Sequence, residues 1–378
     1  MNNVFKKIVS VVAVAAMAVT SMVSLASCGG TTNYAENNDK FYIGATGPLT
    51  GDAASYGNSV QNGAKLAVKH LNAKGGAQFY FEMKDDQAGS TGAAANYDTL
   101  YEAGMQVSLS GVTSGSAEAF TTKANEDKVF CMSPSASADP VINTGDYSFR
   151  LCFGDPDQGT LAAKKIVEDG YATVGALYDS SDSYSKGVYD AFAAEMQKLG
   201  KEFTAKSFTS ATKDFNSYAE ALKDCDVIFM PFYYQNASLV AQALTQKGSD
   251  AVLFGSDGFD GIADYLQGVN NKVMYITPFD VNSTDAKVQA FVAAYEAEYG
   301  EKPDQFAADA YDVVMAIAQA MEQAGITDTT TAPDVIADKL VEVFTSSNFS
   351  FDGVTGSGMT WNKSGACTKD PMIVELNY

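Results

Sequence analysis

Short apolar runs and longer amphipathic stretches alternate along the first half of the chain. The run at 41–45 predicts a strand. The next stretch predicts a helix whose apolar residues share one face, at Val60, Ala64, Ala67, Val68 and Leu71. Further strands are predicted at 79–83, 107–109 and 129–132, and further helices at 91–103 and 116–125. This alternation indicates βαβ units and a parallel sheet with helices on both faces.

The pattern restarts after Pro156. Strands are predicted at 173–177, 203–207, 227–232, 252–254 and 273–276, with helices at 159–168, 184–199, 215–222 and 238–246. The chain is then mainly helical, at 288–299, 306–324 and 335–344, before a glycine-rich hairpin at 351–356 and a last strand near 372–376. The fold class predicted is therefore α/β, with two sheet-based lobes.

The N-terminal segment has the pattern of an export signal. Lys6 and Lys7 form a basic start, residues 8–23 are almost wholly apolar or small, and Leu25-Ala26-Ser27-Cys28 closes the run. The alternative is an uncleaved transmembrane anchor. The strongly apolar stretch at 8–19 is short for about 30 Å of hydrocarbon, which favours the signal peptide.

The Leu-Ala-Ser-Cys ending resembles the lipobox of bacterial lipoproteins. The resemblance implies cleavage after residue 27 and a diacylglycerol on Cys28, whose two acyl chains suffice for stable anchoring. Residues 28–40 are polar and predict a tether. The expected location is extracytoplasmic, with the chain lipid-anchored to the bacterial cell membrane.

Charge and cysteine content narrow the possible partners. The chain has a formal charge of −21, and loss of Lys6 and Lys7 with the signal leaves −23. Such an acidic surface repels nucleic acid and anionic headgroups, so no nucleic-acid partner is expected. Four further cysteines match no metal-binding spacing and allow three disulfide pairings or free thiols: Cys131, Cys152, Cys225 and Cys367.

Catalytic and metal-binding patterns are missing. His70 is the only histidine and lies within the first amphipathic helix, which favours a surface or boundary role. Asp85 and Asp86 follow a strand and favour a solvated turn. The acidic segment 179–190 carries Tyr184 where a calcium-binding loop needs glycine. No nucleophile elbow, dinucleotide turn or phosphate loop occurs, so we expect no enzyme, no metal and no cofactor.

The loop at 47–57 (Gly-Pro-Leu-Thr-Gly-Asp-Ala-Ala-Ser-Tyr-Gly), with 62–64 and 72–76, resembles the start of the leucine/isoleucine/valine-binding proteins. Weaker matches follow in order at 133–135, 149–150, 233–234, 255–258, 355–356 and Trp361. Together they cover essentially the whole mature chain. The family comprises type I solute-binding proteins of ABC importers.

This resemblance implies two lobes joined by three hinge crossovers, with the ligand between them. We place the crossovers near 152–156, 277–279 and 369–372. The expected division assigns 41–153 and 280–369 to lobe 1, and 154–279 and 370–378 to lobe 2.

The resemblance also implies residues for the acidic end of a ligand. Ser114 holds the α-carboxylate in the matching family position, and the segment 112–116 opens a helix whose N–H groups suit an anion. Ser116 is assigned with it, although helix capping is an alternative for both serines. Ser135 and Ser137 match ligand-binding positions after a strand; a polar turn is their alternative. Thr113 occupies the position of a cysteine that many relatives carry in a disulfide.

Asp257 matches the acidic residue that pairs with the ligand ammonium, at a strand end where α/β folds place ligands. Tyr56, Tyr184 and Tyr233 are expected to enclose the ligand's apolar side chain. Phe259 is a weaker candidate for the same role, with a core position as the alternative. Arg150, the sole arginine, matches a family residue beside the first hinge and fits a structural role there.

The function that this resemblance implies is a monomeric, lipid-anchored receptor that delivers an apolar amino acid to ABC permease subunits. The aromatic lining fits leucine, isoleucine or valine and tolerates phenylalanine. The same fold binding an amide, urea or an aromatic acid is one alternative. A sensory ligand-binding receptor is another.

Overall fold

The computed structural model describes residues 39–376. The predicted signal peptide, Cys28 and most of the predicted tether therefore lie outside the described residues. Within 39–376, none of the helices combines the length and hydrophobicity that a membrane crossing needs.

Two sheets organise the chain, as predicted. The first sheet has the order β2 (Phe79–Asp85), β1 (Phe41–Gly47), β3 (Val107–Ser108), β4 (Phe130–Ser133), β5 (Ser148–Arg150). All of its neighbouring pairs are parallel. Strand β5 and the short helix α5 (Asp139–Ile142) were not predicted, because each is too short to show a period.

The second sheet has the order β11 (Met372–Glu375), β10 (Val273–Thr277), β9 (Val252–Gly255), β8 (Val227–Met230), β6 (Val174–Asp179), β7 (Thr204–Phe208). Only β11 runs antiparallel to its neighbour. Without β11, the order follows the same scheme as the first sheet, since the first strand of each unit lies between the second and the third. The two units thus share a topology.

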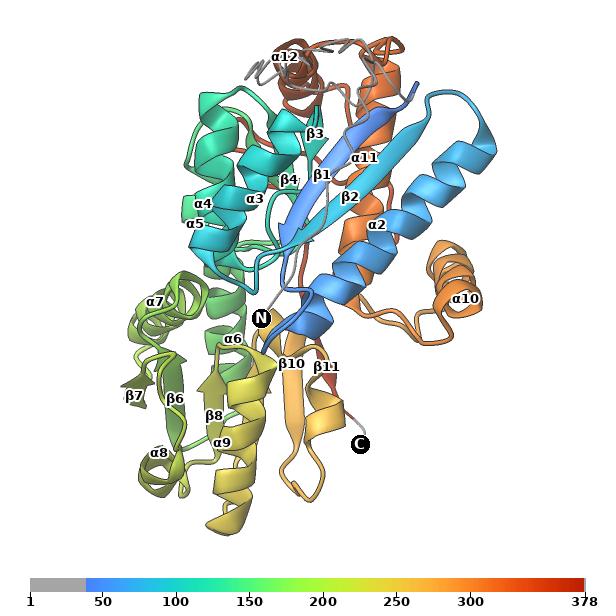
Figure 1. Ribbon diagram of the computed structural model, residues 1–378. Helices are drawn as coiled ribbons and strands as arrows, with labels where there is room; N and C mark the ends of the chain where they lie inside the picture. The colour runs from blue at the N-terminus through green and yellow to red at the C-terminus, as the bar shows by residue number, and fades with distance from the viewer. Residues whose placement is uncertain (1–38, 377–378) are drawn as a thin grey trace, which may run out of the picture. The chain divides into compact units, whose positions relative to one another are not determined.

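Helices cover the two sheets (Figure 1). The first sheet is accompanied by α2 (Ala54–Lys74), α3 (Ser90–Glu102) and α4 (Ser114–Glu126), and later in the chain by α10 (Ala286–Tyr299), α11 (Gln305–Gln323) and α12 (Pro333–Phe344). The second is accompanied by α6 (Asp155–Glu168), α7 (Ser183–Lys198), α8 (Asn216–Leu222) and α9 (Tyr234–Gln246). The predicted helices are confirmed, with small shifts at their ends.

One extensive helix contact joins distant parts of the sequence: α11 lies along α2 (Figure 1). A side chain at Gly63 in α2 would lie 2.0 Å from the carbonyl oxygen of Ala307 in α11. Glycine therefore lets the two backbones approach. Because α11 follows β6 to β10 in the sequence, this contact places a late segment of the chain beside the first sheet.

The chain passes between the two units three times within the described residues: after β5, after β10 and before β11. We refer to the unit around the first sheet as lobe 1 and that around the second as lobe 2. The residue bounds assigned to each lobe from the sequence stay a prediction.

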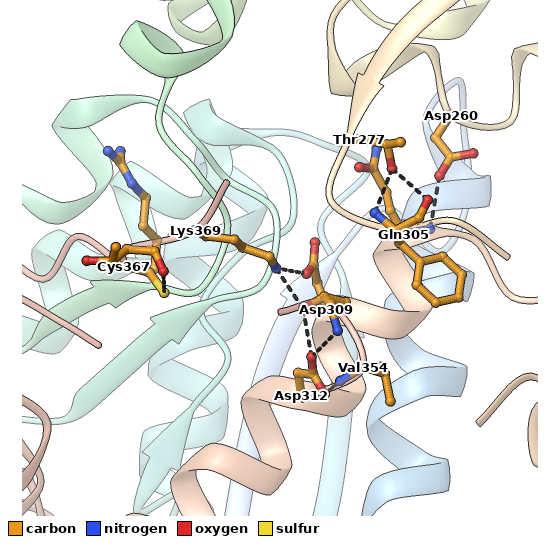
Figure 2. Close-up of polar contacts among 12 residues, drawn as sticks. Asp260, Thr277, Gln305, Asp309, Asp312, Val354, Cys367 and Lys369 are labelled. Carbon is orange, nitrogen blue, oxygen red and sulfur yellow. Dashed lines mark hydrogen bonds and ion pairs between the residues drawn. The ribbon is translucent and has the colours of Figure 1, made fainter. Parts of the chain in front are cut away.

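The third passage contains a buried ion pair (Figure 2). The ammonium of Lys369 contacts the carboxylate of Asp309 in α11, and their side chains are 1% and 3% exposed. Lys369 Nζ also donates to Thr355 Oγ1 over 2.7 Å, and Thr355 Oγ1 donates to Asp312 Oδ2 over 2.6 Å. Burial raises the pKa of Asp309, and the Lys369 ammonium opposes that rise. The network ties the last segment to lobe 1 just before the chain enters lobe 2.

We predict that Lys369→Met lowers the free energy of unfolding by about 3–5 kcal/mol, because Asp309 would be left as an uncompensated buried charge. Urea denaturation measures this. The control Lys165→Met breaks the exposed pair of Lys165 with Asp169 and should cost less than about 1 kcal/mol.

The double variant Lys369→Met/Asp309→Leu removes both charges and should recover much of the loss. A double variant as unstable as Lys369→Met alone would contradict this explanation.

Candidate functional site

The carboxyl ends of the strands in both sheets meet around one cavity. In lobe 1, β1 leads to Tyr56, β3 to Ser114, and β4 to Ser135. In lobe 2, β6 leads to Tyr184, β8 to Tyr233, and β9 to Asp257. Ligands of open parallel sheets bind at this edge, where the strand order reverses. The site therefore uses the same edge of both lobes.

The cavity is small and is lined by ten residues from both lobes. Its lining consists of Tyr56, Val112, Thr113, Ser114, Ser135, Tyr184, Tyr233, Asp257, Gly258 and Phe306. The space not filled by atoms is about 250 Å³, but the centre of a water molecule has access to only about 10 Å³ of it. Larger hollows lie elsewhere on lobe 1, one of about 790 Å³ beside His70 and Tyr311. We take the small cavity as the site because the strand ends converge on it.

Six of the eight predicted ligand-binding residues line this cavity: Tyr56, Ser114, Ser135, Tyr184, Tyr233 and Asp257. The structure thus brings together residues up to about 200 positions apart, such as Tyr56 and Asp257. Ser116 and Ser137 are not among the lining residues. Both are buried, and both have partners within the protein.

Ser116 is not a helix cap either, since Thr113 is the N-cap residue of α4 and no side chain makes a capping hydrogen bond there. The Ser116 hydroxyl lies 2.9 Å from Thr113 Oγ1 and donates to the Thr113 carbonyl over 3.0 Å. Ser137 belongs to a network at the first passage between lobes, where its hydroxyl donates to Asp155 Oδ1 over 2.7 Å. Arg150 Nη1 donates to the Ser137 carbonyl over 2.7 Å, in keeping with the structural role expected for that arginine.

Helix α4 directs its N-terminus at the cavity. Thr113 is the N-cap residue, and Ser114 is the first helical residue. Ser110, just before, has a positive φ of 57°, a left-handed conformation that turns the chain from β3 toward α4. The first amides of a helix have no partner within it and attract anions. This end of the cavity suits a carboxylate, and Ser114 Oγ accepts only a long bond, 3.3 Å, from the Ala138 amide.

Asp257 is the one formally charged residue among those that line the cavity. Its carboxylate is held by Tyr184, whose hydroxyl donates to Oδ1 over 2.6 Å and accepts from the Gly258 amide over 2.9 Å. Burial raises the pKa of Asp257 to about 6, although hydrogen bonds from Tyr184 and Gln158 oppose the rise. The ionised form lacks a cationic partner in the lining. This end of the cavity therefore suits a cation.

Aromatic rings form the remaining walls. Tyr184 stacks on Tyr233 with ring centroids 5.1 Å apart, and Tyr56 packs against Phe306 at 4.3 Å. The Tyr56 hydroxyl crosses between lobes, donating to the Gly258 carbonyl over 2.5 Å and accepting from the Tyr234 amide over 3.2 Å. The buried Tyr233 hydroxyl has no hydrogen-bond partner among the described residues. It is available to a ligand.

The sequence did not single out Phe306 for the site. Its position depends on α11 returning to lobe 1 and starting beside α2, which no local pattern reveals. Phe259, the weaker candidate, is wholly buried in the core, with its ring against Gly255.

The histidine and the cysteines of the described chain, which could in principle carry chemistry, do not line the cavity. His70 Nδ1 lies 3.0 Å from the Tyr311 hydroxyl, and burial lowers the pKa of the imidazole. Cys131, Cys152, Cys225 and Cys367 are free thiols. Within residues 39–376, no group of three or more histidine, cysteine or acidic residues is placed to hold a metal ion.

Comparison with known proteins identifies the family. The model of the periplasmic binding protein family matches residues 40–377. The chain belongs to the periplasmic binding proteins. This is a family of solute-binding proteins rather than enzymes, and it implies a location outside the cytoplasm.

Individual relatives agree with this assignment. The chain is 28% identical over 293 residues to the Leu/Ile/Val-binding protein BraC3 of Rhizobium johnstonii, covering 75% of this chain and 79% of the relative. It is also 28% identical over 320 residues to a leucine-, isoleucine-, valine-, threonine- and alanine-binding protein of Pseudomonas aeruginosa, covering 82% of this chain and 84% of that one.

Among solved structures, the branched-chain amino acid transporter substrate-binding protein LivJ of Streptococcus pneumoniae, in complex with isoleucine, matches with a TM-score of 0.79 and 28% identity. That match covers 89% of this chain and 96% of LivJ. A solute-binding protein of R. palustris in complex with benzoate has a TM-score of 0.80 at 19% identity, covering 89% of this chain and 94% of the other. The second likeness shows the fold alone. The type I periplasmic-binding-protein fold expected from the sequence is confirmed.

We predict that Asp257→Asn raises the unfolding temperature of the free protein at pH 7.5. A carboxyl group whose folded pKa is raised to about 6 destabilises the fold when ionised. This penalty is full above about pH 6 and absent below the unfolded pKa near 4, where both states are protonated. The stabilising effect should therefore shrink as the pH falls from 7.5 to 4.5.

Thermal denaturation of the wild type and the variant across this range measures the effect. A variant that is no more stable at pH 7.5, or that gains equally at every pH, would contradict the assignment of Asp257 as an uncompensated buried charge.

Proposed function

We propose that the chain is a lipid-anchored solute-binding protein of an ABC importer, which binds a branched-chain or other apolar α-amino acid between its lobes. The observation that carries this proposal is the charge pattern of the cavity. Asp257, the one carboxylate among the lining residues, belongs to one lobe, and the N-terminus of α4 at Ser114 belongs to the other. An α-amino acid carries the two complementary charges.

The uncharged lining supports an apolar side chain. Tyr56, Tyr184, Tyr233 and Phe306 present ring surface, and Val112 adds an aliphatic group. Rings of this kind enclose alkyl groups, and hydroxyls among them orient a ligand. The names of relatives that bind leucine, isoleucine and valine support the same ligand class.

The size of the cavity implies that the lobes must separate for entry. The cavity has room for about one water molecule, so an amino acid cannot enter while the lobes are in contact as they are here. Periplasmic binding proteins open and close by hinge bending around their ligand. The three passages between lobes are the segments that would bend, and the bounds 41–153 with 280–369, and 154–279 with 370–378, are our proposal for the two moving bodies.

An aromatic acid is the second candidate, because a structural neighbour binds benzoate. The cavity lining argues against it here. A simple carboxylate would leave Asp257 without a cation, and no lysine or arginine is among the lining residues. Burying an uncompensated charge beside a second anion is strongly unfavourable.

The proposed partners follow from the transport role: ABC permease subunits receive the amino acid, and diacylglycerol on Cys28 holds the monomer at the membrane. The lipobox resemblance supports the anchor. The acidic body, which anionic headgroups repel, supports attachment through lipid rather than through surface charge.

Calorimetry with L-leucine, L-isoleucine, L-valine, L-phenylalanine and benzoate tests the ligand class. We predict binding of at least one amino acid and none of benzoate. Asp257→Asn should weaken amino-acid binding by about 2–5 kcal/mol, because it removes one charge of a buried pair. Isocaproate, which is leucine without its ammonium group, is the matched control ligand.

Isocaproate, like benzoate, leaves Asp257 without a cation, so it should bind the wild type far more weakly than leucine, and Asp257→Asn should not weaken its binding further. Benzoate binding without amino-acid binding would overturn the proposal, and an unchanged leucine affinity in Asp257→Asn would overturn the role of Asp257.

Mass spectrometry of the protein produced in a bacterial host tests the anchor. We predict an N-terminal peptide that begins at Cys28 and carries a diacylglycerol. Cys28→Ser should abolish the lipid and release the protein from the membrane fraction. A mature wild-type chain that retains Met1 would contradict the lipoprotein assignment.

A further inference from the structure

The start of α11, in lobe 1, contacts the turn of lobe 2 that carries Asp257. Gln305 is the first residue of this helix and is 2% exposed. Its side-chain Nε2 donates to the backbone carbonyl of Asp257 over 2.6 Å. Its backbone N–H donates to Oδ2 of Asp260 over 2.9 Å. Figure 2 shows Gln305 beside Asp260.

These two hydrogen bonds lie at the two ends of the turn, one at Asp257 and one at Asp260. The turn is the short 3₁₀ helix η1 (Asp257–Phe259), and Asp260 follows it directly. Asp260 is also held within lobe 2, where it accepts a bond from the Tyr275 hydroxyl over 3.3 Å. The Tyr56 hydroxyl of lobe 1 bonds to the middle of this turn, at the Gly258 carbonyl, and Gln305 adds a bond at each end. The side chain at 257 faces the cavity.

The chemistry of a helix start explains the backbone bond. The first amides of α11 have no partner within the helix, and its N-terminal dipole favours a carboxylate such as Asp260. Asp304, the N-cap, is already occupied, since it accepts from the Ala307 amide over 2.9 Å and from Ser59 Oγ over 2.6 Å. The Gln305 N–H is therefore free to bond across the lobe junction.

The side-chain bond requires a donor of this length. A carbonyl oxygen accepts from the amide nitrogen of glutamine. Methionine has a similar length and no donor, and an ionised glutamate would place an acceptor against the carbonyl. Because the Asp257 carbonyl is buried, loss of this donor leaves it without that partner.

We propose that Gln305 is a positioning residue for ligand binding: it holds the turn that presents Asp257 when the lobes are in contact, and it stabilises that contact. It is not among the residues that line the cavity. Its neighbour Phe306 does line the cavity and packs on Tyr56. The start of α11 therefore supplies one wall of the site and also bonds to the turn that carries Asp257. The link to ligand affinity rests on the function proposed above.

Gln305→Met and Gln319→Met form a matched pair of variants of the full mature chain. Gln319 lies on the same helix, and its Nε2 also donates to a backbone carbonyl, that of Ser350, over 2.9 Å. That bond does not reach lobe 2. A general effect of replacing a glutamine in α11 should therefore appear in both variants.

Stopped-flow kinetics with L-leucine and L-isoleucine measure the effect on binding. We expect Gln305→Met to raise the dissociation rate by about tenfold with little change in the association rate, because the bond forms only when the lobes meet. Gln305→Glu should raise it at least as much. Gln319→Met should leave both rates unchanged.

Small-angle X-ray scattering of the free proteins provides a readout that needs no ligand. Gln305→Met should increase the radius of gyration relative to the wild type and to Gln319→Met, because the lobes separate more often. If the wild type binds no amino acid, the proposed ligand class fails, and scattering alone still decides the role of Gln305. Unchanged scattering and unchanged dissociation for both Gln305 variants would overturn it, as would equal changes in Gln319→Met.

Discussion

The parallel arrangement of the strands in both sheets, β11 excepted, is the constraint on which the site depends. A parallel strand order forces every strand in a sheet to end at the same edge, so the loops that follow those strands gather there. Tyr56, Ser114 and Ser135 reach the cavity in this way from lobe 1, and Tyr184, Tyr233 and Asp257 do so from lobe 2. No residue of the site needs to be close to another in sequence.

Burial of the Asp257 carboxylate in the site is electrostatically unfavourable. Asp257 is buried, its pKa is raised to about 6, and the cavity lining supplies hydrogen bonds but no cation. Such an arrangement is expected to lower the stability of the free protein at neutral pH, and it provides an attractive partner for a positively charged group. By contrast, Asp309 in α11 has a cationic partner in Lys369 of the third passage, and neither residue lines the cavity. The two buried carboxylates thus differ in whether a cationic side chain lies beside them.

Hydrogen bonds and ring contacts join the two lobes beside the cavity. Tyr56 bonds to the Gly258 carbonyl, and Gln305 bonds to Asp257 and Asp260. Hydrogen bonds of this kind contribute modestly to stability because water replaces them when the surfaces part. Such bonds are compatible with the hinge opening proposed above, whereas the packing of α2 on α11 is a close helix contact within lobe 1.

Much of the architecture was predictable from the sequence, because strands and long amphipathic helices repeat their apolar residues at spacings that can be seen along the chain. The two α/β units and nearly all long helices were predictable, and family resemblance pointed to Tyr56, Ser114, Ser135, Tyr184, Tyr233 and Asp257, which the fold brings to one cavity. Strand β5 has three residues and no readable period. Only the tertiary structure decided that Phe306 walls the site, that Gln305 holds the Asp257 turn, and that Ser116 and Ser137 have partners inside the protein. Each of these outcomes depends on which distant segment packs beside the residue, and that is a property of the folded chain rather than of its local pattern.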